Sequence, residues 1–222
     1  VDASGSMTGA RFINAQQALG KLLERFHQDD QIFVSVFNTG FTLLMPWSND
    51  HTALVRALSG IVPRSGTYLY SSISAALPIL DGGTNRKKAL VVISDGDDNE
   101  RMAGMNRGLL TRAVQQAQRS QALIYVIGIG EPRPSLEQWL ALDAEARRRF
   151  FYDPPVDVAL LRQLTDPTGG YTQLVPATAD LTSTVVSIAD DLSTQYTIGY
   201  QAASQNDAFH AVKVIVARHP EY

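Results

Sequence analysis

The sequence predicts an α/β protein with a doubly wound, mostly parallel central sheet, helices on both faces and an antiparallel hairpin at its C-terminal edge. Apolar, β-branched runs alternate along the chain with segments in which apolar residues recur every three or four positions. Because parallel neighbours need a crossover connection, strands separated by helices form a parallel sheet covered on both faces. With 222 residues, 45% of them apolar, the chain suits one well-filled core. We therefore expect a single domain over residues 1–222, with its core at 1–194 and the edge hairpin at 195–222.

The first part of the chain predicts one helix and two strands. Apolar residues recur at helical spacing over residues 12–26, with Gly20 as the weak helix former inside the run. Residues 31–37 form a nearly continuous β-branched and aromatic run, which predicts a strand buried on both faces. The run at 42–47 predicts a shorter strand, and Pro46 places it at the sheet edge because proline lacks the amide of a central ladder.

The next segment predicts two helices and then the central strand. Asn49 or Asp50 can cap a helix that Pro63 closes. A further helix over about 69–80 leads toward residues 88–94, which carry the strongest central-strand signal in the sequence.

The second half continues the alternation of helices and strands. Residues 123–129 predict another apolar strand, and residues 171–174 predict a short one. Two last runs, at 195–200 and 211–217, alternate apolar and polar residues and predict the antiparallel hairpin. Helices are expected at 109–120, 136–149, 158–164 and 180–193.

Composition and charge exclude several classes of function. A net charge of −3 and a pI near 5.8 supply no basic field for nucleic acid or for an anionic membrane surface. No apolar run approaches the roughly 18 residues of a membrane-spanning helix, so this segment is not expected to insert into a membrane. The absence of cysteine excludes disulfides and thiolate metal sites, and it leaves the compartment open.

The chain opens almost directly on a loop with candidate functional residues, Asp2 to Ser6. A strand needs about five residues. We therefore expect the natural protein to extend upstream, with any signal segment outside this chain.

Three loops with oxygen-bearing side chains are predicted to meet at one edge of the sheet, because ligands of open α/β sheets bind outside the carboxyl ends of the strands. Two carboxylates and three hydroxyls, without histidine, suit a hard divalent cation. Mg²⁺ or Mn²⁺ fits this set better than Ca²⁺ or Zn²⁺, since few negative ligands leave the ion electrophilic toward an incoming anion. The candidate ligands are Asp2, Ser4 and Ser6 in the first loop, Thr67 before the third helix, and Asp95 after the central strand.

These loops resemble the metal-ion-dependent adhesion site of von Willebrand factor A domains. The pattern Asp-x-Ser-x-Ser at residues 2–6 is followed by Ser-Gly-Thr at 65–67 and by Ile-Ser-Asp-Gly at 93–96. The resemblance implies a Rossmann-like fold in which a Mg²⁺ ion is held directly or through water and a ligand carboxylate completes its octahedron. The metal ligands it implies are Asp2, Ser4, Ser6, Thr67 and Asp95.

The resemblance also implies a role and a location. It indicates a binding module rather than an enzyme, in which the ion bridges to an Asp or Glu of a protein partner in adhesion or another protein–protein interaction. Residues 168–171 and 195–200 look like the tail of a bacterial, typically exported branch of these domains. The chain is therefore expected to be extracytoplasmic or secreted.

Other interpretations stay open. Asp2 to Ser6 can be a capped helix entry alone, since Ser, Asp and Gly are favoured there. A metal-assisted hydrolase would also use carboxylates and Mg²⁺ on such a sheet, although the sequence places no His, Lys or Glu beside Asp95. In a third interpretation the domain is a structural subunit of a larger assembly, and the ion only orders the loops.

Two charged clusters are expected to lie outside the site. Asp97, Asp98 and Glu100 are interpreted as a solvated loop paired with Arg101. The run Arg147 to Arg149 is interpreted as a favourable partner of a helix dipole.

Overall fold

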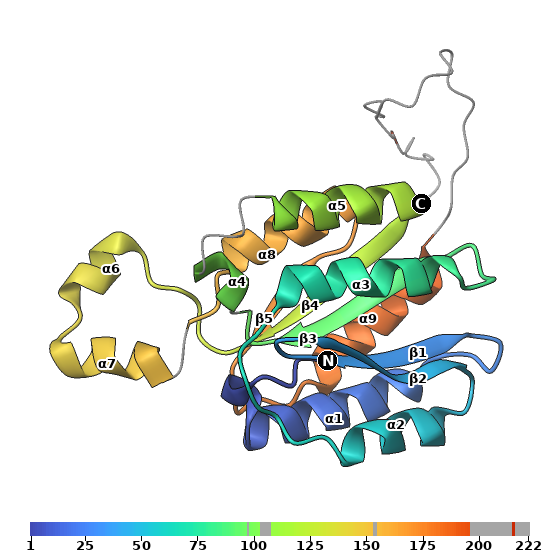
Figure 1. Ribbon diagram of the computed structural model, residues 1–222, viewed down its shortest axis with the longest axis horizontal. Helices are drawn as coiled ribbons and strands as arrows, with labels where there is room; N and C mark the ends of the chain where they lie inside the picture. The colour runs from blue at the N-terminus through green and yellow to red at the C-terminus, as the bar shows by residue number, and fades with distance from the viewer. Residues whose placement is uncertain (97, 103–107, 153–154, 196–214, 216–222) are drawn as a thin grey trace, which may run out of the picture.

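Two sheets form the centre of the protein in a computed structural model that describes residues 1–96, 98–102, 108–152, 155–195 and 215 (Figure 1). Strands β3 (Lys88–Ser94), β4 (Ala122–Ile129) and β5 (Thr172–Val175) are parallel, in the order β3-β4-β5. Strands β1 (Ile32–Phe37) and β2 (Phe41–Ser48) pair antiparallel. The predicted α/β fold with a parallel sheet is confirmed.

Residues 1–3 join the two sheets into one layer. The Phe37 amide donates to the Val1 carbonyl at 3.0 Å, and the Ala3 amide donates to the Phe37 carbonyl at 2.7 Å. On the other side, the Asp2 amide donates to the Ile93 carbonyl at 2.8 Å. The start of the chain therefore lies between the carboxyl ends of β1 and β3. A cavity of about 630 Å³ continues from Val1 between these strands.

Helices cover both faces of this layer (Figure 1). On one face lie α3 (Leu69–Asp81), α5 (Leu109–Ser120) and α8 (Val158–Thr165). On the other face lie α1 (Ala10–Leu23) and α9 (Thr182–Thr194), and α2 (His51–Ser59) packs against α1, β1 and β2. This two-sided cover is the doubly wound arrangement that the alternating pattern predicts.

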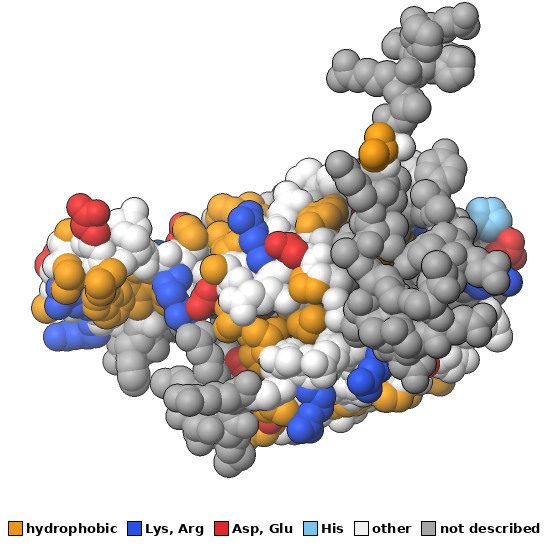
Figure 2. All heavy atoms as spheres, turned by 90° about the horizontal axis from the view of Figure 1, so that it is seen from above, with side chains coloured by type: hydrophobic (Ala, Val, Ile, Leu, Met, Phe, Trp, Pro, Cys, Tyr) orange, Lys and Arg blue, Asp and Glu red, His pale blue; other side chains and the backbone are white. Residues whose placement is uncertain are grey.

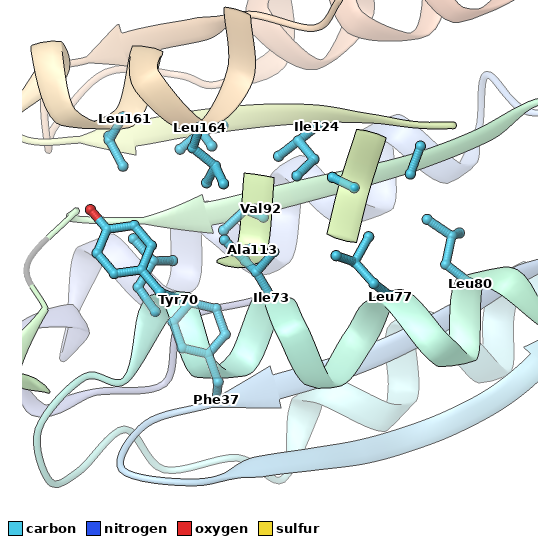
Figure 3. Close-up of a cluster of buried hydrophobic side chains, with 14 of the residues drawn as sticks. Phe37, Tyr70, Ile73, Leu77, Leu80, Val92, Ala113, Ile124, Leu161 and Leu164 are labelled. Carbon is cyan, nitrogen blue, oxygen red and sulfur yellow. The ribbon is translucent and has the colours of Figure 1, made fainter. Parts of the chain in front are cut away.

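Apolar side chains from helices and strands form a core on each face. In the core of Figure 3, Ile73 and Leu77 of α3 lie against Val92 of β3. Ala113 and Ala117 of α5 are fully buried, and their small side chains let α5 approach α3 and β4 closely. These contacts fix β3 and β4, whose carboxyl ends lie at the end of the sheet where the loops with the candidate ligands are predicted to meet.

The segment predicted as one helix at 136–149 is two helices, so that prediction is wrong. Helix α6 (Leu136–Ala141) begins with a capping box between Ser135 and Gln138. Leu142 is extended, and the Asp143 carboxylate accepts from the Ala146 amide at 2.7 Å, which caps the new helix α7 (Ala144–Tyr152). A local cap thus outcompetes the continuous helical pattern.

Helices α6 and α7 form an arm that projects from the body (Figure 1). The Arg147 guanidinium donates to the carbonyls of Trp139 and Leu140, at 3.3 and 2.9 Å. The first arginine of the basic run therefore binds the C-terminal end of the preceding helix, which is a favourable contact with that helix's dipole. On the face seen in Figure 2, charged side chains of both signs are scattered rather than gathered in one patch.

Two further expectations concern the edges of the fold. Strand β2 pairs only with β1 among the described strands, as expected of an edge strand, but with eight residues it is longer than β1 and not shorter. The predicted hairpin at 195–222 lies outside the described residues, apart from 195 and 215. In the described part of the chain, no helix has the length and apolar character needed to cross a membrane.

Candidate functional site

Asp2 is fully buried and held from both of its carboxylate oxygens. Oδ1 accepts from the Ser4 amide at 2.8 Å, a local turn in which a side chain binds the backbone two residues on. Oδ2 accepts from the Ser94 hydroxyl at 2.6 Å. A carboxylate oxygen can accept two hydrogen bonds, so the Asp2 carboxylate keeps capacity for a further ligand.

Ser4 and Ser6 bring two hydroxyls together beside Asp2. Ser6 lies in the short 3₁₀ helix η1 (Gly5–Met7), and Ser4 directly precedes it. The two Oγ atoms are 3.1 Å apart. The Met7 side chain is fully buried and anchors this turn to the core. The spacing Asp-x-Ser-x-Ser thus turns both hydroxyls toward one place.

The loop that carries Thr67 is tied to the loops on both sides. The Gly5 amide donates to the Ser65 carbonyl at 2.9 Å. The Thr67 amide donates to Asn99 Oδ1 at 2.6 Å, and the Asn99 amide donates back to the Thr67 carbonyl at 2.9 Å. A Cβ on Gly66 would lie only 2.3 Å from Asn99 Oδ1, so this contact requires glycine. Thr67 itself is buried.

Asp95 directly follows β3 and is fully buried. The next residue, Gly96, has a φ of +77°, a conformation that other residues rarely adopt. Its amide donates to Ser94 Oγ at 3.0 Å, and a Cβ there would lie 3.0 Å from Val156 Cγ1. Ser94 therefore bonds to Asp2 and to the turn that follows Asp95.

The electrostatics show that the two carboxylates are close enough to repel each other. The pKa of Asp2 is raised from 3.8 to about 7, chiefly by burial and then by the negative charge of Asp95. The hydrogen bonds from Ser94 and Ser4 lower this pKa and offset part of the shift. A cation placed beside both groups would favour their ionised forms.

Arg11 brings a positive charge to the same place. It lies in the first turn of α1, where the helix dipole disfavours a basic side chain. Its Nη1 donates to the Ser6 carbonyl at 3.1 Å and lies 3.6 Å from Asp95 Oδ2, and its side chain is only 11% exposed. Arg11 is not among the residues predicted from the sequence, although a basic residue at a helix start is a signal visible there.

The acidic residues after Asp95 are not a solvated loop, so that interpretation is wrong for Asp98 and Glu100. Asp98 is buried, and its carboxylate accepts from the amides of Tyr70 at 3.3 Å and Glu100 at 2.9 Å. The Glu100 carboxylate accepts from the Ser71 hydroxyl. These bonds join the start of α4 (Asn99–Met102) to the start of α3, where negative charge is favourable. Asp97 and the Arg101 side chain lie outside what the structure describes.

Hydrogen bonds join the loops of the candidate ligands at the carboxyl ends of β1 and β3. Helix α4 lies at the same end of the sheet in Figure 1. Among the described residues, no three His, Cys, Asp or Glu side chains are grouped as a metal site. Two buried carboxylates would therefore need hydroxyl or water ligands beside them, and such an all-oxygen set fits a hard cation. The ligands predicted from the sequence are Asp2, Ser4, Ser6, Thr67 and Asp95.

Comparison with known proteins finds relatives of similar sequence and similar fold. Residues 1–97 match the family model of the von Willebrand factor type A domain. The chain is 25% identical, over 142 residues, to human inter-alpha-trypsin inhibitor heavy chain H4, a match that covers 59% of this chain and 15% of that protein. The chain therefore spans a small part of the length of this relative.

Two solved structures are similar over most of the chain. A von Willebrand factor type A protein from Catenulispora acidiphila has a TM-score of 0.68 and 17% identity, covering 86% of this chain and 41% of that one. An aerotolerance-related membrane protein from Bacteroides fragilis NCTC 9343, with multiple mutations to serines, has a TM-score of 0.67 and 19% identity, covering 87% and 96%.

Proposed function

Because residues 1–97 match the von Willebrand factor type A domain and the chain shares the fold of such domains, we propose that it binds a partner protein through a divalent metal ion. Domains of that family are protein-interaction modules, which supports binding of a protein partner. A Mg²⁺ or Mn²⁺ ion, held by the loops at the carboxyl ends of the strands, captures an Asp or Glu side chain of the partner.

The observation that carries the proposal is the pair of fully buried carboxylates, Asp2 and Asp95, among hydroxyl-bearing loops. Burying a second negative charge beside the first is costly, as the raised pKa of Asp2 shows. A divalent cation would offset that cost and use the hydroxyls of Ser4, Ser6 and Thr67 as neutral ligands. When bound, the ion supplies electrostatic attraction for an anionic group.

The charges also explain why the attracted group would be an acid. Two carboxylates balance a divalent ion, and Arg11 adds one positive charge 3.6 Å from Asp95. The loaded site would therefore carry a net positive charge in a poorly solvated place, which favours a partner carboxylate. This supports capture of an acidic side chain over capture of a cation or an apolar group.

Titration calorimetry of Mn²⁺ and Mg²⁺ into chelator-stripped protein tests the metal site. We expect saturable binding at one site in the parent and none in Asp95→Asn, which keeps the shape of the side chain and removes a charge. Asp29→Asn makes the same change at a side chain that is 94% exposed and should bind as the parent does. Equal binding by Asp95→Asn and the parent would show that the ion lies elsewhere.

Water-proton relaxation of the Mn²⁺-loaded protein tests the capture of an acid. Acetate that binds the ion displaces a coordinated water and should lower the relaxation enhancement, whereas acetamide, a neutral molecule of the same shape, should not. An enhancement that acetate leaves unchanged would argue against an open coordination position. Hydrolysis of a generic phosphoester that is lost in Asp95→Asn would instead favour the hydrolase interpretation.

The proposed location is outside the cytoplasm. It is supported by the similarity to a bacterial membrane protein, described above, and by the sequence resemblance to an exported branch. If the domain is instead a structural subunit, its complex should persist in chelator.

A further inference from the structure

Among the described residues, Arg11 brings a positive charge to the site. Its guanidinium is hydrogen-bonded to the Ser6 carbonyl of the first loop and ion-paired with Asp95. We propose that Arg11 is a built-in counter-cation: it balances the charge of Asp95 when no metal ion is bound, and it weakens the binding of that ion. The inference rests on the proposed metal site and concerns how that site is regulated. It assigns to Arg11 a role that the metal ligands themselves do not have.

The position of Arg11 supports this role. The side chain starts from the first turn of α1 and is nearly buried, although that end of a helix disfavours a positive charge. Its Nη1 is held by the Ser6 carbonyl, within the first loop. Its Nη2 reaches the end of β4, since a Cβ on Gly130 would lie 3.8 Å away. The guanidinium therefore spans from α1 across the site toward β4.

The fixed positive charge of Arg11 acts in opposite directions on the proposed metal ion and on the proposed partner carboxylate. A guanidinium a few ångströms from a bound divalent ion repels that ion, and the low solvent exposure leaves the repulsion poorly screened. The same guanidinium attracts a carboxylate that approaches the ion. Metal alone should therefore bind weakly, and metal together with an acidic group should bind more tightly. Arg11 thus makes occupation of the site depend on the partner.

Replacing the charge should strengthen the binding of metal alone. In titrations of Mn²⁺ into chelator-stripped protein, we expect Arg11→Gln to bind at least about tenfold more tightly than the parent. Arg11→Met, which keeps a long apolar stem without the charge, should do the same and serves if Arg11→Gln folds poorly. Arg11→Lys keeps the charge and should stay within about threefold of the parent.

Lys21→Gln is the matched control, because it removes the same charge from the same helix at a side chain that is 51% exposed. It should bind Mn²⁺ as the parent does. Thermal unfolding supplies a second readout: in chelator, Arg11→Gln should unfold at a lower temperature than the parent, and added Mn²⁺ should raise its unfolding temperature by more.

The metal site and the role of Arg11 can fail separately. Saturable binding by the parent, with equal or weaker binding by both Arg11→Gln and Arg11→Met, would overturn the role of Arg11 and leave the metal site standing. Binding by the charge-free variants alone would support the role, because the parent's own cation then occupies the site. No binding by any of these proteins would overturn the metal site and this inference with it.

Discussion

The Ser94 hydroxyl donates a 2.6 Å hydrogen bond to Asp2 Oδ2 across 92 positions of the sequence. Both residues are fully buried, and Ser94 also accepts from the amide of Gly96, the residue after Asp95. One hydroxyl therefore fixes the direction of one candidate metal ligand and the turn that follows another. Groups that orient metal ligands in this way affect metal affinity strongly even though they do not touch the ion.

Ser94→Ala should therefore weaken Mn²⁺ binding by about 10- to 100-fold. It should also destabilise the protein by about 1–3 kcal/mol, since a buried carboxylate loses a partner. Calorimetry and chemical denaturation measure the two effects. Thr184→Val removes another buried hydroxyl, in α9 on the opposite face from α3, and should leave metal affinity unchanged. Unaltered affinity in Ser94→Ala would mean that Asp2 is oriented by other contacts.

The raised pKa of Asp2 predicts how stability changes with pH in the metal-free protein. Asp2 holds its proton up to about pH 7 in the folded protein, and in the unfolded chain it releases that proton near pH 3.8. Between these values the folded state binds more protons, so the free energy of unfolding contributed by Asp2 falls as pH rises. This contribution is present in full below the unfolded pKa and is lost as pH rises through the folded pKa.

In chelator, the unfolding temperature of the parent should fall relative to that of Asp2→Asn by at least about 5 °C from pH 4 to pH 8. Calorimetric scans across this range give the difference. Asp29→Asn, at an exposed position, should follow the parent. A constant difference between the parent and Asp2→Asn would show that Asp2 ionises alike in both states.

The sequence predicts the strands and helices best where local pattern and burial agree. Helix α5 begins and ends at the predicted residues, and β3 spans the predicted 88–94, because the apolar pattern of each segment agrees with the face or end that packs into the core. The break between α6 and α7 was not predicted, since it depends on Asp143 acting as a cap inside a helical pattern. Local capping is a small effect that pattern analysis averages away.

The site residues were predictable only in part, for a physical reason. Asp95 directly follows β3, and Asp2 bridges to Phe37 at the end of β1; the ends of these two strands are visible in the sequence. The residues that hold the candidate ligands in place, Ser94, Asn99 and Arg11, are not visible in the sequence. They act through the directions of side chains on separate loops. Those directions arise only once β1, β3 and the start of α1 are packed together.

Two hydrogen bonds between Asn99 and Thr67 hold the loop that carries Thr67. Asn99→Ala removes the acceptor of the Thr67 amide, so that amide should exchange with solvent at least about tenfold faster in hydrogen-exchange measurements. Asn14→Ala removes another side chain that binds backbone carbonyls, at Ala177 and Ala179, and should leave Thr67 unaffected. Because a Cβ on Gly66 would strike Asn99 Oδ1, Gly66→Ala should also speed the exchange.

The effects of Asn99→Ala and Gly66→Ala on stability should not be additive. Once Asn99→Ala has removed the obstructing oxygen, Gly66→Ala should have a smaller effect on stability than in the parent, by at least about 0.5 kcal/mol. A cycle of the four proteins, measured by chemical denaturation, gives this coupling. Additive effects would mean that Gly66 is needed for a reason other than its contact with Asn99.

Gly170 is required for a close contact between β4 and the turn before β5. A Cβ on Gly170 would lie 2.0 Å from the Ile124 carbonyl oxygen, a backbone atom in the middle of β4 that the paired strands hold in place. Gly170→Ala should therefore lower the free energy of unfolding by at least about 2 kcal/mol, measured by chemical denaturation, because relief of this overlap must separate the strands. Gly20→Ala is the matched change: a Cβ there meets nothing within 4 Å inside α1, and alanine should stabilise that helix by up to about 1 kcal/mol. Equal effects of the two substitutions would show that the chain at Gly170 can move away from β4 without loss of pairing.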